Sequence, residues 1–194
     1  MEAFLYMRDK MRTLNKTKMD ILRLLWQVGR PMHLKEISDR MNLKTRCVNM
    51  HILNLVKGGY VAKSNSRFYT LTDLGREILG FPRIDGALAR KILSEVPREK
   101  VFHFYSGIDK PLMIYSSSLG DFCEKIRYIN LESIEFHVSR GDFENWIHFL
   151  GDVELASRLR VIKESNLSGE NLREEIFRVV KLRCDELKKI ALGS

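Results

Sequence analysis

Three segments near the start of the chain have apolar residues at the three- and four-residue intervals of a helix. They are residues 15–28, 35–41 and 45–57. The first segment ends at Gly29, which is typical of a left-handed C-cap, and a tight turn at Asn42 and Leu43 separates the other two. In the third segment the core-facing positions are Val48, Ile52, Leu55 and Val56. We therefore expect three packed helices, with a short extended piece at residues 32–34 before the second.

The pattern then changes to one that favours short strands. Residues 60–63 and 67–71 are rich in aromatic and branched side chains, and the polar residues 64–66 join them. This arrangement predicts a β-hairpin. Thr72 stands where it can cap a fourth helix over residues 73–79.

Beyond residue 80 the pattern predicts one further hairpin and many helices. The strands of that hairpin are expected at residues 101–105 and 112–115. Helical patterns cover residues 83–96, 119–129, 132–140, 142–150, 152–163 and 169–191. Asp142, Asp152 and Ser168 are the expected N-caps of the last three. The predicted fold class is therefore α+β, mainly α with small β elements.

The distribution of charge and a connector that contains glycine and proline divide the sequence into two halves. Gly80-Phe81-Pro82-Arg83 is a natural connector, so we predict domains at residues 15–80 and 81–194. A helical extension is expected at residues 1–14, where Phe4, Leu5, Met7, Met11 and Leu14 recur at helical intervals. Residues 1–80 hold 15 Lys and Arg against 7 Asp and Glu, whereas the remaining residues hold 18 of each. The whole excess of +8 lies in the first domain, which is thus the part suited to a polyanion.

Composition excludes several classes of protein. The chain has 194 residues, 44% of them hydrophobic and 30% charged, which argues against disorder. No apolar run approaches the ~18 residues of a membrane span, and Glu2 and Asp9 are unlike a secretory leader. Cys47, Cys123 and Cys184 are spaced too widely for a C-x-x-C metal site. We expect a soluble, cytoplasmic protein with free thiols and no membrane partner.

One string in the first domain resembles a known family. It consists of Leu43, Val48, His51-Ile52, Leu55, Gly59-Tyr60-Val61 and Tyr69-x-Leu71-Thr72-x-x-Gly75. Its order and spacing are similar to those of winged helix-turn-helix domains in prokaryotic, especially archaeal, transcriptional regulators. The resemblance implies that residues 15–80 bind double-stranded DNA, with the third helix in the major groove and the hairpin as a wing.

The side chains available for such contacts fall into two groups. The expected base-reading residues are Arg46, Asn49, Thr45 and Met50. The expected phosphate-binding residues are Lys44, Lys57, Lys63, Asn65 and Arg67. Two alternatives stay open: these charges form an ordinary solvated face, or the domain docks on basal transcription machinery without specific DNA reading. Met50 and Leu53 favour the second alternative, since exposed apolar residues suit a protein partner.

A distinctive motif lies in the second domain. Residues 132–137, 140–147 and 150–156 resemble a small domain of unknown function found in archaeal and bacterial proteins, over roughly residues 100–190. The motif contains Glu135, His137, Arg140, Asp142, Glu144 and His148. These side chains could hold a metal, but a buried polar network is the favoured interpretation. No nucleophile motif or phosphate-binding glycine loop is present in the sequence, so we expect neither an enzyme nor a cofactor.

The last predicted helix has an apolar seam. Phe177, Val180, Cys184 and Leu187 recur at intervals of three and four residues. The seam fits either a homodimer contact or packing within its own domain. We therefore expect a transcriptional regulator that is a homodimer, whose second domain dimerises, senses a signal or recruits a partner.

Overall fold

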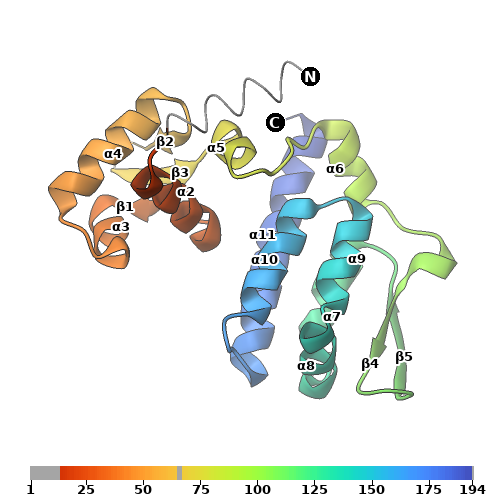
Figure 1. Cartoon of the computed structure of the whole chain (residues 1–194). Coiled ribbons are helices and arrows are strands. Elements are labelled where there is room, and N and C mark those ends of the chain that lie inside the picture. Colours follow the sequence, from red (N-terminus) through yellow and green to blue (C-terminus); the bar gives the residue numbers. More distant parts are fainter. Residues whose placement is uncertain (1–13, 65–66, 194) are drawn as a thin grey trace. The chain divides into compact units, whose positions relative to one another are not determined.

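The computed structural model describes residues 14–64 and 67–193 and has the predicted α+β class (Figure 1). Within these residues, helices predominate and the strands form two small antiparallel sheets. The chain divides into two compact units, residues 1–83 (unit 1) and residues 84–194 (unit 2). Each unit encloses its own cluster of buried apolar residues, so each has a separate core.

Unit 1 is built on three helices: α2 (Lys16–Val28), α3 (Leu34–Met41) and α4 (Thr45–Lys57). Asn15 begins α2 by accepting a hydrogen bond from the Lys18 amide at 3.0 Å, and Gly29 ends it with φ of 66°. The predicted core positions Val48, Ile52 and Leu55 are fully buried. These three side chains fix the rotation of α4 about its axis and leave its opposite side in solvent.

A three-stranded sheet completes unit 1. Its order is β1 (Met32–His33), β3 (Phe68–Leu71), β2 (Val61–Lys63), all antiparallel. We call β2 and β3 together the wing hairpin. Helix α5 (Asp73–Ile78) follows it, and the Thr72 hydroxyl both accepts from the Gly75 amide at 3.1 Å and donates to the Gly59 carbonyl at 2.7 Å. Thr72 thereby ties the start of α5 to the turn that precedes β2.

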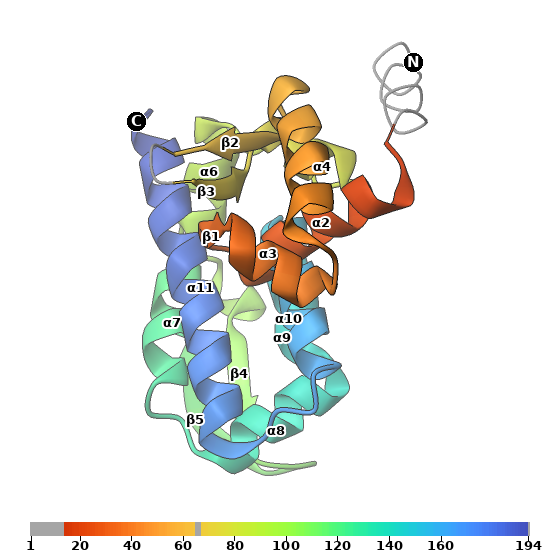
Figure 2. The ribbon, with the colours of Figure 1, turned by 90° about the vertical axis from the view of Figure 1, so that its left-hand side faces the viewer.

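Unit 2 is mostly helical and contains one hairpin. Its elements are α6 (Gly86–Leu93), the 3-10 turn Arg98–Lys100, β4 (Phe102–Tyr105), β5 (Pro111–Ser116), α7 (Leu119–Ile126), α8 (Leu131–Arg140), α9 (Asp142–Leu150), α10 (Val153–Lys163) and α11 (Gly169–Leu192). The long α11 runs the length of this unit and packs against α6, α7, α8 and α10 (Figure 2). Phe102 and Phe104 of β4 point into the core, where they meet the rings of Phe122 and Phe143.

A buried ion network joins α10 to α11. Arg183 donates from Nε and Nη2 to the two carboxylate oxygens of Asp152, at 2.7 and 3.1 Å. Asp152 is fully buried and also caps α10 by accepting from the Leu155 amide at 3.0 Å. Arg183 further contacts Glu154 at 3.2 Å and Glu186 at 2.7 Å. Every charge in this network thus has an opposite partner, as burial requires.

Several predicted boundaries differ from the structure. The units divide after residue 83 rather than 80, because Phe81 stacks on Trp26 of unit 1 at 4.8 Å between ring centroids. Helix α6 begins at Gly86, since Asp85 caps it, and not at residue 83. The predicted N-cap at Asp142 is wrong: Gly141 occupies that position, and the Asp142 carboxylate bonds to His137 instead.

The seam of the last helix lies inside unit 2. Val180, Cys184 and Leu187 are buried, and Phe177 is half-buried against the same core. Of the two alternatives, packing within its own domain is therefore what the structure has. Residues 1–13 of the predicted N-terminal extension lie outside the described residues. Over the part of the chain that is described, no helix is both long and apolar enough to span a membrane.

Candidate functional site

A groove in unit 1 runs between α4 and the wing hairpin. Its volume is about 510 Å³, and its lining residues are Leu34, Thr45, Arg46, Asn49, Leu53, Lys63, Arg67 and Tyr69. Residues 46, 49 and 53 recur at helical spacing on the side of α4 that faces away from the core. Lys63 and Arg67 come from the wing hairpin and the turn before β3. The fold thus places one helix face and one hairpin around a common hollow.

The structure brings together five of the residues expected to contact DNA: Thr45, Arg46, Asn49, Lys63 and Arg67. The others do not line the groove. Lys44 is the exposed N-cap of α4, Lys57 is exposed at its last position, and Met50 is 56% exposed between them. Asn65 lies outside the described residues. Sequence reasoning missed Leu34 and Tyr69 as lining residues, because their apolar spacing indicated core positions only.

The charge of the groove is entirely positive. Arg46, Lys63 and Arg67 are its only charged lining residues, and no ion pair joins them to another described residue. Elsewhere in unit 1 an arginine does have a partner: Arg30 contacts Glu36 at 2.7 Å, and this hydrogen bond lowers the pKa of Glu36. The groove is therefore a site where cationic side chains remain available to an external anion.

The hydroxyl of Thr45 already has a hydrogen-bond partner within unit 1. Its hydroxyl lies 3.0 Å from the Ser38 hydroxyl, which itself donates to the Lys35 carbonyl at 2.8 Å. Since the Ser38 proton is used there, the Thr45 hydroxyl is placed to donate to the Ser38 oxygen. In that arrangement Thr45 accepts a further hydrogen bond, which suits a base amino group.

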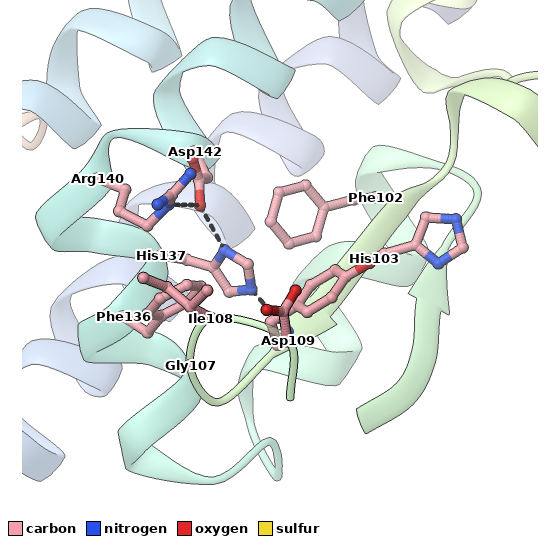
Figure 3. A pocket seen from close by; sticks show the side chains of 10 residues that line it. Phe102, His103, Gly107, Ile108, Asp109, Phe136, His137, Arg140 and Asp142 are labelled. Atoms are coloured by element: carbon pink, nitrogen blue, oxygen red, sulfur yellow. Dashed lines mark hydrogen bonds and ion pairs between the residues drawn. The ribbon is translucent and has the colours of Figure 1, made fainter. Parts of the chain in front are cut away.

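A second hollow lies in unit 2, beside the tip of the β4–β5 hairpin (Figure 3). We call it the hairpin pocket. Its volume is about 320 Å³, and its lining residues are Phe102, His103, Tyr105, Gly107, Ile108, Asp109, Phe136, His137, Arg140 and Asp142. Three segments form it: the hairpin, the end of α8 and the start of α9. His137, Arg140 and Asp142 of the sequence motif therefore do meet at one site.

Both ring nitrogens of His137 are already bonded. The Tyr105 amide donates to Nε2 at 2.8 Å, so Nδ1 carries the proton and donates to the Asp142 carboxylate at 2.8 Å. Burial lowers the pKa of His137 below its usual value, and the bond to Asp142 offsets this only in part. His137 is thus a neutral structural side chain with no nitrogen free for a metal or for proton abstraction.

The remaining motif residues do not converge on a metal site. Glu135 accepts from the Gly169 amide at 2.9 Å, His148 is exposed, and Arg140 donates from Nε to Asp142 at 3.1 Å. Among the described residues no group of three or more His, Cys, Asp or Glu is arranged for metal binding. The polar-network interpretation agrees with this geometry.

These observations define an α+β protein with a basic groove in one unit and a small mixed pocket in the other. The chain belongs to a family of unknown function, DUF5752, whose model matches residues 64–181. The match begins at the wing hairpin and ends within α11, so it includes part of both units. Comparison with curated proteins and with solved structures gave no significant match.

Proposed function

We propose that the chain is a sequence-specific DNA-binding transcriptional regulator of the winged helix-turn-helix type. The observation that carries this proposal is the groove between α4 and the wing hairpin, in which Arg46, Lys63 and Arg67 have no acidic neighbour among the lining residues. The order of elements in unit 1 also supports it: three helices, a hairpin and a further short helix.

In this proposal α4 enters the major groove. Arg46 matches the O6 and N7 acceptors of guanine, and Asn49 matches N6 and N7 of adenine. The exposed Met50 suits the methyl group of thymine, and Thr45 accepts from a base amino group. These four side chains decide which sequence is bound.

The phosphate contacts come from residues around this face. Lys44 and Lys57 stand at the two ends of α4, and Lys63 and Arg67 belong to the wing. Each contact releases a counterion, so affinity falls with salt with a log–log slope near −0.9 per phosphate neutralised. The net +8 of residues 1–80 supplies the long-range attraction.

The test begins with selection of a preferred duplex from genomic fragments by the full chain, followed by fluorescence anisotropy. Arg46→Ala should weaken binding to that duplex about 5- to 150-fold and relax its sequence preference. Lys63→Ala should weaken all duplexes alike and reduce the salt slope by about one. The matched control is Arg23→Ala, since Arg23 is exposed, pairs with Asp20 at 3.1 Å and does not line the groove. Unchanged binding by both groove variants would contradict the proposal.

A second candidate function is protein docking on transcription machinery. Met50 and Leu53 of α4 are 56% and 50% exposed, which favours a partner with an apolar surface. Under this alternative, partner capture survives nuclease treatment and is lost in Met50→Ser/Leu53→Ser, whereas Arg46→Ala has little effect.

A homodimer remains part of the main proposal, with a contact other than the α11 seam. Light scattering of the full chain measures the oligomeric state.

A further inference from the structure

Arg140 presents a fixed pair of donors at the hairpin pocket. Its guanidinium lies 5.2 Å from the centroid of the Phe136 ring, and its Nε donates to Asp142 at 3.1 Å. These contacts hold the plane of the group, while Nη1 and Nη2 have no hydrogen-bond partner among the described residues, and the side chain is 53% exposed. A planar pair of free donors matches the two oxygens of a carboxylate.

Asp109 supplies a negative charge at the same pocket. It lies in the hairpin turn, which is closed by the hydrogen bond from the Ser106 amide to the Lys110 carbonyl at 3.0 Å. Its backbone has φ of 58°, a conformation that the turn imposes on a residue other than glycine. No described residue pairs with its carboxylate, and Figure 3 shows Asp109 and Arg140 on opposite sides of His137. An ammonium group is the partner that this carboxylate lacks.

Apolar side chains also line the hairpin pocket. Phe102, Tyr105, Phe136 and Ile108 contribute rings and a branched chain to the lining. Ile108 lines the pocket and is 76% exposed. A ligand bound in the pocket would bury part of this side chain. A volume of about 320 Å³ is at the lower end for ligand pockets, so the ligand is small.

We infer that the hairpin pocket binds a small zwitterion with an apolar body, of the α-amino acid class. The carboxylate of the ligand pairs with Arg140, and its ammonium group pairs with Asp109. Its side chain packs on Ile108 and on the aromatic residues that line the pocket. The Asp142 carboxylate accepts from both His137 and Arg140, so its charge is engaged and does not compete for the ammonium group. Binding is non-covalent, and this inference is independent of the DNA groove.

Three probes of one shape separate the two charge contacts. The full chain is titrated by calorimetry with L-phenylalanine, with 3-phenylpropanoate, which lacks the ammonium group, and with 2-phenylethylammonium, which lacks the carboxylate. L-phenylalanine should bind about tenfold or more tightly than either analogue, because each analogue loses one charge-assisted contact. Saturation of unit 2 should also shift the NMR signal of the Tyr105 amide, which lies at the pocket wall.

Variants assign each contact to its residue. Arg140→Ala should remove the advantage of L-phenylalanine over the ammonium probe, and Asp109→Asn should remove its advantage over the carboxylate probe. Both residues are exposed, so both variants are expected to fold. Arg127→Ala is the matched control, since Arg127 also lies over a phenylalanine ring, at 5.5 Å from Phe177, and pairs with Glu124 outside the pocket.

Three outcomes would overturn the inference. They are no binding of L-phenylalanine, equal binding of L-phenylalanine and either analogue, and an Arg140→Ala or Asp109→Asn variant that behaves like Arg127→Ala.

Discussion

Two groups of arginines, Arg46 and Arg67 in unit 1 and Arg183 in unit 2, have opposite surroundings. In unit 1, Arg46 and Arg67 line an open groove in which no lining residue is acidic. In unit 2, Arg183 is 5% exposed and is surrounded by the carboxylates of Asp152, Glu154 and Glu186. A buried cation must be neutralised within the protein, whereas a solvated one without a partner is available to an external anion. The surroundings of each guanidinium, rather than the net charge of the chain, thus separate a structural role from a binding role.

The largest expected effect is on the buried network. Arg183→Met should destabilise unit 2 by about 3–5 kcal/mol, because it leaves Asp152 charged and unpaired in the core. Unit 1 should be unaffected. Each unit contains one tryptophan, Trp26 or Trp146, so urea unfolding followed by fluorescence in Trp26→Phe and Trp146→Phe backgrounds reports the two units separately. A loss below about 1 kcal/mol would contradict the structural role assigned to this arginine.

Acidification should also act on unit 2. The folded pKa of His137 is lowered, so the unfolded chain takes up this proton first as the pH falls. The contribution of neutral His137 to the stability of unit 2 is fully present above pH ~6.5, the ordinary pKa of histidine. It is lost as the pH falls from there through the lowered pKa of the folded state. The free energy of unfolding of unit 2, measured from pH 7.5 to 5, should fall, and His137→Gln should flatten this dependence. A rise in the free energy of unfolding on acidification would contradict the lowered pKa of His137.

A smaller effect is expected from a neutral contact of unit 1. Thr72→Ala removes the hydroxyl that caps α5 and bonds to Gly59, which should cost about 1 kcal/mol. Thr72→Ser keeps the hydroxyl and should recover most of the loss. Urea unfolding in the Trp146→Phe background measures both variants. Equal destabilisation by Ala and Ser would show that the methyl group, and not the cap, stabilises this turn.

The smallest effect on stability is expected in the groove of unit 1. Arg46→Ala should change the stability of unit 1 by less than about 0.5 kcal/mol, because no described residue forms an ion pair with this exposed side chain. The same variant is expected to lose DNA affinity. A stability change as large as that of Arg183→Met would make the contrast between the two units wrong.

Local features were predictable from the sequence, and distant pairings were not. The bounds of α4 and α9 match the predicted segments, since apolar spacing and flanking glycines decide both. Apolar periodicity also indicated which side of α4 faces solvent, and hence Arg46 and Asn49 in the groove. In contrast, Asp152 and Arg183 are 31 residues apart, and no local pattern connects them. The hairpin pocket joins three separate segments, so nothing in the sequence around Asp109 indicated that it lines the same pocket as Arg140.

The double use of one carboxylate narrows what can occupy position 152. Serine, threonine and asparagine are ordinary replacements for aspartate at the start of a helix. At position 152 these residues would keep the hydrogen bond to the Leu155 amide. They would leave the buried Arg183 without the negative charge that Asp152 supplies. Natural or designed relatives that lose this aspartate should therefore also lose the arginine, so that positions 152 and 183 change together.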